Sequence, residues 1–142
     1  MNKRILYIDD ELLFVRSLAE ALEEAGYEVK KSNCHATVFQ VIEKEKPDLI
    51  VLDLLMPTKT QTDLKTNIRA GLSTLKDLRL QKHVRLPIIF VTVVDDIAAH
   101  KEIRRIEKDS GFNHVVILVK PVLPSTLLEN VRGLIGNADV AK

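Results

Sequence analysis

The chain has 142 residues, the length of one ordinary domain, and its 46% hydrophobic and 29% charged residues are typical of a folded globular protein. Its formal net charge of +1 gives no electrostatic reason to expect binding to nucleic acid or to an anionic membrane. A single cysteine, an acidic pair as early as residues 9 and 10, and the lack of a long apolar window argue against a disulfide, a secretory signal and a membrane span. We therefore expect a cytoplasmic protein.

Short apolar runs alternate along the chain with segments of helical period. We expect strands at residues 5–8, 27–31, 49–52, 86–94 and 115–119. We expect helices at residues 11–25, 36–45, 97–108 and 125–135. This alternation predicts an α/β fold in which helices cover both faces of a mostly parallel sheet. The runs 49–52, 88–91 and 115–119 are continuously aliphatic, which is typical of central strands, whereas 27–31 alternates and suits an edge.

Two further segments are less regular. After Pro57, leucine and isoleucine recur at helical spacing over residues 64–78, but Gly71 interrupts the pattern. This segment is either one long helix with a weak point or a short helical insertion that precedes the main helix. The mixed run at residues 101–108 (KEIRRIEK) is most simply a solvated helix face with i,i+4 ion pairs.

Polar residues follow the apolar runs at the points where strands end. They are Asp9 and Asp10, Asp53, Thr92 and Lys120. Because the carboxyl ends of parallel strands meet at one rim of the sheet, we expect these side chains to converge. Clustered carboxylates repel one another unless a cation sits among them, and Mg²⁺ suits a small all-oxygen set. A metal ion, a lysine and a hydroxyl together can hold a phosphoryl group, and an aspartate can accept one.

Four motifs in this order resemble the receiver domain of two-component response regulators. They are ILYIDDE at residues 5–11, LDLLMP at 52–57, PIIFVT at 87–92 and VKP at 119–121. The resemblance covers residues 3–136 and implies a doubly wound, five-stranded parallel sheet of order 2-1-3-4-5, the flavodoxin-like arrangement. It also implies one receiver domain over residues 1–136, followed by a tail at 137–142.

The resemblance implies a role for each site residue. Asp53 would accept a phosphoryl group from the phosphohistidine of a sensor histidine kinase or a histidine phosphotransfer protein. The implied Mg²⁺ ligands are the carboxylates of Asp10 and Asp53, the backbone carbonyl of Leu55 and, through a metal-bound water, Asp9. Thr92 and Lys120 would each contact a phosphoryl oxygen, and the peptide bond before Pro121 would be cis.

The sequence also departs from the family pattern. The Asp-Gly that usually opens the third helix has its nearest counterpart at Gly71, which implies an extended segment at residues 58–71. Residues 95–112 also look longer than usual, so we expect an altered face on the fourth helix and fifth strand. Ile117 replaces a common aromatic residue, and Val93 is bulkier than usual. Leu55 and Val94 would flank the phosphoryl group without a polar side chain to orient water, which predicts slow hydrolysis.

These observations favour a phosphorylatable signalling switch rather than an enzyme with a separate substrate. It would act on a downstream protein that the sequence does not name, with no direct binding to nucleic acid or membrane and a possible homodimer. One alternative is a pseudo-receiver that uses the same fold as a phosphorylation-independent interaction module. Another is a Mg²⁺-dependent phosphohydrolase, which Leu55 disfavours because such enzymes usually have a second acid at that position.

Overall fold

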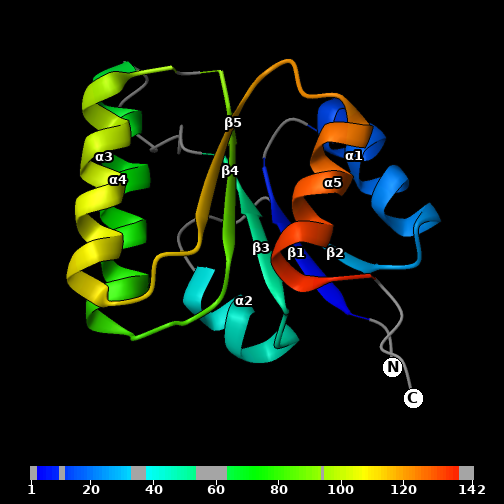
Figure 1. The fold of residues 1–142 in the computed structure, drawn as a ribbon, viewed down its shortest axis with the longest axis horizontal. Helices are drawn as coiled ribbons and strands as arrows, with labels where there is room; N and C mark the ends of the chain where they lie inside the picture. The colour runs from blue at the N-terminus through cyan, green and yellow to red at the C-terminus, as the bar shows by residue number, and fades with distance from the viewer. Residues whose placement is uncertain (1–2, 10–11, 33–37, 54–63, 94, 138–142) are drawn as a thin grey trace.

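A computed structural model describes residues 3–9, 12–32, 38–53, 64–93 and 95–137 of the chain (Figure 1). The strands are β1 (Arg4–Ile8), β2 (Glu28–Ser32), β3 (Leu49–Leu52), β4 (Ile88–Thr92) and β5 (Val115–Val119). The helices are α1 (Leu12–Glu24), α2 (Val38–Glu45), α3 (Leu64–Lys76), α4 (Ile97–Ser110) and α5 (Pro124–Ile135), and a π-helical segment, Asp77–Gln81, follows α3. Strands and helices alternate as the sequence predicts.

The five strands form one parallel sheet of order β2-β1-β3-β4-β5, which confirms the predicted fold class. Each parallel pairing needs a crossover, and the helices between strands supply it. The register places Leu6 beside Ile50, Ile50 beside Ile88, and Ile88 beside Val115. The carboxyl ends of the strands therefore share one rim of the sheet.

The helices cover the two faces of the sheet, and alternate strand residues pack against each layer (Figure 1). Leu6, Ile8 and Leu52 belong to a core cluster that includes residues of α2, α3 and α4. Tyr7 and Val51 belong to a second cluster that includes residues of α1 and α5. Consecutive residues of one strand are therefore all buried, which explains the continuous aliphatic runs.

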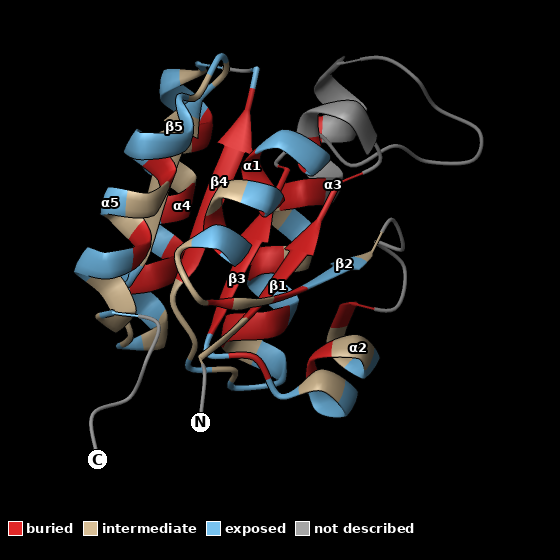
Figure 2. Cartoon of the chain, turned by 90° about the vertical axis from the view of Figure 1, so that its right-hand side faces the viewer, coloured by how far each residue is buried: buried red, intermediate tan, exposed pale blue. Residues whose placement is uncertain are grey.

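The prediction that residues 115–119 form a central strand is wrong, because β5 lies at the edge of the sheet. Its first four side chains are only half-buried and Val119 is 38% exposed, whereas β3 and β4 are buried throughout (Figure 2). An aliphatic run indicates that both faces of a strand are covered by helices. It does not indicate whether the strand has neighbouring strands on both sides. At the opposite edge, β2 confirms the prediction made for residues 27–31.

Gly71 lies inside α3 and is buried, so the described part of the 64–78 stretch is one continuous helix. This agrees with the first of the two alternatives, and residues 58–63 lie outside the described residues. The π-helical segment then changes the direction of successive side chains. It buries two consecutive residues, Leu78 and Arg79, against the neighbouring layer. Within the described residues, we find no helix long and apolar enough to span a membrane.

Candidate functional site

Two aspartates lie at the carboxyl ends of neighbouring strands. Asp9 follows β1 directly, and its N–H donates a 3.1 Å hydrogen bond to the carbonyl of Ser32. Asp53 follows β3, and its N–H donates to the carbonyl of Ile8 at 3.3 Å. Both residues are buried. These backbone bonds continue the sheet ladder beyond the strand ends and so place the two carboxylates side by side on its rim.

Lys120 bridges the two aspartates. Its Nζ atom lies 3.4 Å from Oδ2 of Asp9 and 3.4 Å from Oδ2 of Asp53, and its side chain is only 7% exposed. The Lys120 N–H donates a 2.7 Å hydrogen bond to the carbonyl of Thr92, the last residue of β4. The Lys120–Pro121 peptide bond is cis, as expected. The residues that the sequence predicts at three separate strand ends therefore converge in space.

The electrostatic balance of this group is negative. Buried charges need compensation by partners, and here one ammonium group faces two carboxylates. The electrostatic effect of the two carboxylates extends to the Tyr7 side chain in β1. Burial raises the pKa of the Tyr7 phenol, and the negative charges of Asp9 and Asp53 raise it further. The two carboxylates supply oxygen atoms of the kind that hold a metal cation in proteins.

The donor chemistry of the described residues fits a magnesium ion. The carboxylates of Asp9 and Asp53 converge on the same nitrogen, so their oxygens could also face one small cation. Mg²⁺ takes oxygen ligands, keeps several waters and needs few protein groups. Within the described ranges, no group of three or more His, Cys, Asp or Glu side chains could hold a metal ion. The other two predicted ligands, Asp10 and Leu55, lie outside those ranges.

Two of the described residues, Val93 and Ile117, depart from the family pattern. Thr92 is fully buried, whereas the next residue, Val93, is 58% exposed. Ile117 of β5 lines a pocket of about 250 Å³ together with His100 and Ile103 of α4. Val94 lies outside the described residues, so the prediction of slow hydrolysis remains a prediction.

A buried ion pair lies away from the rim, and the sequence interpretation missed it. Nε of Arg79 lies 2.7 Å from Oε2 of Glu107 in α4, and both side chains are at most 1% exposed. Arg79 also donates to the carbonyl of Val84 at 2.8 Å, and the other oxygen of Glu107 accepts from the N–H of His114 at 3.2 Å. The ring of Phe112 covers the guanidinium, with its centroid 4.8 Å from Cζ.

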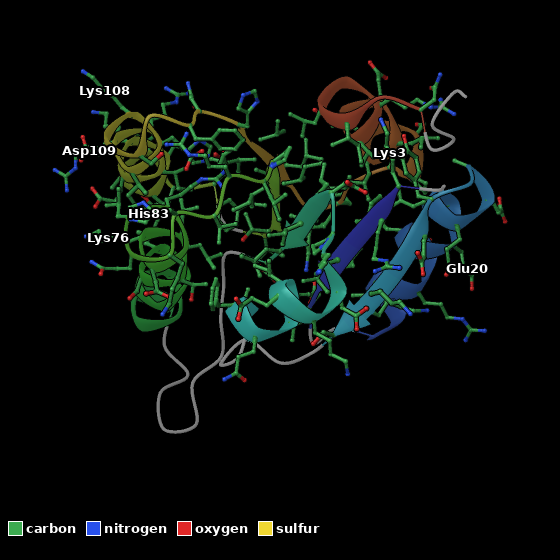
Figure 3. All side chains as sticks on the ribbon, turned by 90° about the horizontal axis from the view of Figure 1, so that it is seen from below. Lys3, Glu20, Lys76, His83, Lys108 and Asp109 are labelled. Carbon is green, nitrogen blue, oxygen red and sulfur yellow. The ribbon has the colours of Figure 1, made fainter. Side chains whose placement is uncertain are left out.

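This pair corrects the interpretation of residues 101–108 as a solvated face. Figure 3 shows Lys108 and Asp109 pointing away from the body of the protein, and Glu102 makes a 2.8 Å surface pair with Arg105. Glu107 lies on the opposite, buried side of α4 with Ile103 and Ile106. A sequence signal was present, because Glu107 follows Ile103 by four residues and so continues the apolar stripe.

The fold and the rim define a class of protein: a doubly wound α/β domain with buried carboxylates and a lysine at the carboxyl ends of its strands. The family model described as "Response regulator receiver domain" matches residues 5–132. The chain belongs to the response regulator receiver family, which takes part in two-component signalling.

Two similar proteins are named as transcriptional regulators. The chain is 38% identical over 96 residues to the alkaline phosphatase synthesis transcriptional regulatory protein PhoP of Bacillus subtilis (strain 168). The matched region is 68% of this chain and 35% of PhoP. It is 31% identical over 134 residues to the probable transcriptional regulator ycf27 of Cyanophora paradoxa. The matched region is 94% of this chain and 48% of ycf27. The chain thus spans half or less of the length of these curated relatives, both of which are named as transcriptional regulators.

Solved structures share the fold over nearly the whole chain. A putative response regulator from Chloroflexus aurantiacus J-10-fl superposes with a TM-score of 0.69 at 27% identity, covering 94% of this chain and 98% of that one. The chemotaxis response regulator CheY4 of Vibrio cholerae gives a TM-score of 0.70 at 25% identity, covering 95% of this chain and all of that one (100%).

Proposed function

We propose that this domain is a phosphorylatable switch whose phosphoryl acceptor is Asp53. The phosphoryl donor is a phosphohistidine on a sensor histidine kinase or a histidine phosphotransfer protein. The observation that carries the proposal is the position of Lys120, whose Nζ lies 3.4 Å from the carboxylates of both Asp53 and Asp9 in a buried setting. A buried lysine beside a strand-end aspartate can neutralise the charge that a phosphoryl group brings.

In the proposed reaction, an oxygen of Asp53 attacks phosphorus, an O–P bond forms and the N–P bond of the phosphohistidine breaks, which leaves a neutral histidine after protonation. Lys120 exchanges its carboxylate contacts for a phosphoryl oxygen, and the Thr92 hydroxyl donates to another. Asp9 and Asp53, with Asp10 and the Leu55 carbonyl, are the proposed Mg²⁺ ligands. When bound, Mg²⁺ would neutralise charge that develops on the phosphoryl oxygens.

The proposal also covers the bounds of the domain, its location and its mode of action. Residues 1–136 form one receiver domain with an extended segment at 58–71, and residues 137–142 form a tail. The domain works in the cytoplasm and has no separate substrate. Its phosphorylation shifts the balance between two conformers and so changes binding to a downstream protein.

Phosphorylation by acetyl phosphate with Mg²⁺ tests the proposal. The wild-type chain should gain one phosphoryl group, measured by intact mass, and should bind the phosphoryl analogue beryllofluoride. Asp53→Asn should abolish both, because an amide oxygen is a poor nucleophile for phosphorus. The matched control is Asp109→Asn, which alters an exposed carboxylate on α4 and should leave both unchanged.

The outcome also separates the proposal from the pseudo-receiver alternative. A wild-type chain that neither gains a phosphoryl group nor binds beryllofluoride with Mg²⁺ would favour a phosphorylation-independent interaction module. Modification that survives in Asp53→Asn would place the acceptor elsewhere. Release of phosphate from a small phosphomonoester would instead revive the phosphohydrolase alternative.

A further inference from the structure

One polar atom beneath the rim has no role in the proposed chemistry. Tyr7 of β1 is 1% exposed, and its hydroxyl has no hydrogen-bond partner among the residues that the structure describes. Nearly all buried polar atoms in folded proteins are hydrogen-bonded, so an exception needs a physical explanation. A phenylalanine would fill the same space without leaving an unpaired hydroxyl. The hydroxyl therefore weakens this state of the protein, and no hydrogen bond within the described ranges offsets that cost.

The position of Tyr7 connects it with the carboxylates. Tyr7 precedes Asp9 by two residues, so both residues belong to the same side of the sheet. Its register partner in β3 is Val51, which precedes Asp53 by two residues. Tyr7 and Val51 both belong to the core cluster that includes residues of α1 and α5. Tyr7 thus lies one layer below both aspartates.

The phenol is suited to donate rather than accept. Burial raises its pKa, and the charges of Asp9 and then Asp53 raise it further, so the group stays protonated at neutral pH. The strand register places the residue directly below Asp9 in β1 and beside the residue below Asp53 in β3. A neutral hydroxyl close to a buried carboxylate is a potential hydrogen-bond donor to it.

We propose that Tyr7 is a positioning residue whose hydroxyl donates a hydrogen bond to the Asp9 carboxylate in the phosphoryl-loaded state. The inference rests on the proposed function, because Lys120 turns away from Asp9 only when a phosphoryl group is present. Lys120 and Tyr7 then act in succession. Lys120 compensates Asp9 in the unloaded domain, and Tyr7 takes over part of this role and holds Asp9 in place after loading.

The two tyrosines of the chain provide a matched pair of variants. Tyr7→Phe removes only the hydroxyl and keeps the ring that packs in the core. Tyr27 is also a buried residue, 3% exposed, but its hydroxyl donates to the carbonyl of Gly136 at 2.5 Å, so Tyr27→Phe removes a hydroxyl that has a partner. Tyr27 lies outside the proposed machinery. The chain has no other tyrosine and no tryptophan.

Removing the Tyr7 hydroxyl should affect the unloaded and the beryllofluoride-loaded states differently. Without Mg²⁺ and beryllofluoride, Tyr7→Phe should keep or raise the midpoint of urea unfolding, whereas Tyr27→Phe should lower it. With Mg²⁺ present, titration calorimetry should show that Tyr7→Phe binds beryllofluoride about tenfold more weakly, because a hydrogen bond to a charged group is lost. Tyr27→Phe should bind it as the wild type does. A purely structural role for Tyr7 cannot produce this opposite pair of effects.

Tyrosine absorbance gives an independent signal. In Tyr27→Phe the only remaining phenol is Tyr7, so a change of the absorbance band near 280 nm on adding beryllofluoride would report on this hydroxyl. We expect the change in the wild type and in Tyr27→Phe, and no change in Tyr7→Phe. Equal beryllofluoride affinity in Tyr7→Phe and the wild type would overturn the role of Tyr7 alone. No binding by the wild type would overturn the proposed function and this role with it.

Discussion

Removing one partner of the Arg79–Glu107 pair should cost this domain a large part of its stability. Replacing Glu107 with leucine leaves the Arg79 guanidinium buried, with the Val84 carbonyl and the Phe112 ring as its remaining partners among the described residues. It also leaves the N–H of His114 without the carboxylate oxygen that accepts from it. The substitution therefore removes a favourable contact and also leaves a positive charge buried without its carboxylate partner.

The magnitude follows from this geometry. Removing one partner of a buried ion pair costs about 3–5 kcal/mol, because the remaining charge stays desolvated. Domains are stable by about 5–15 kcal/mol, so Glu107→Leu alone should remove a large part of the total. The double variant Arg79→Met with Glu107→Leu removes both charges and keeps apolar volume. It should recover most of the loss, since a hydrophobic replacement of a buried pair is often neutral or stabilising.

Urea unfolding followed by far-ultraviolet circular dichroism measures these differences, and a double-mutant cycle extracts the coupling between the two residues. Glu20→Ala is the control, because Glu20 pairs with Arg16 at 3.2 Å on the solvated side of α1 and should contribute less than about 0.5 kcal/mol. A cost below about 1 kcal/mol for Glu107→Leu would refute the reasoning. So would a double variant that is no more stable than Glu107→Leu.

Four further outcomes are expected. Asp96→Ala should lower stability by about 1 kcal/mol in urea unfolding, because its side chain caps α4 by accepting from two backbone N–H groups at 2.8 and 3.2 Å. Gly111→Ala should cost about 1 kcal/mol in the same assay, since Gly111 ends α4 with φ of 76° and no atom would meet the added Cβ. The raised pKa of Tyr7 stabilises the fold below the ordinary tyrosine pKa of about 10, so unfolding at increasing pH should show stability falling above about 10, and less steeply in Tyr7→Phe. Mg²⁺ at ten times its Kd should raise the free energy of unfolding by about 1.4 kcal/mol, reversibly with EDTA, and Asp9→Asn should weaken this effect; no response of the wild type would contradict the metal assignment.

The order of elements could be predicted because it depends on local pattern. The α4 stripe repeats every three or four residues, and the runs of β3 and β4 are aliphatic throughout. The rim could also be anticipated, because the ends of parallel strands meet whatever the details of packing. Asp9, Asp53 and Lys120 needed only the strand ends to be placed correctly. The distances among them depend on the packed structure.

Other features depended on which segments meet in space. The edge position of β5 follows from its pairing with β4 alone, and its composition resembles that of a buried strand. Arg79 and Glu107 are 28 residues apart, and only the π-helical segment and the packing of α4 turn them toward each other. The two interpretations of the 64–78 stretch depended on Gly71, which lies within the helix α3.

The sequence by itself determined the strand and helix order, the sheet class and the acidic rim of this protein, because periodicity and strand ends are local properties. The tertiary structure alone decided which charged side chains are buried and which polar atoms lack a partner. Glu107 and Tyr7 read in the sequence as an ordinary surface acid and an ordinary strand residue. Their burial arises from contacts with distant segments, and the cost of desolvating a charge or a hydroxyl depends on those contacts.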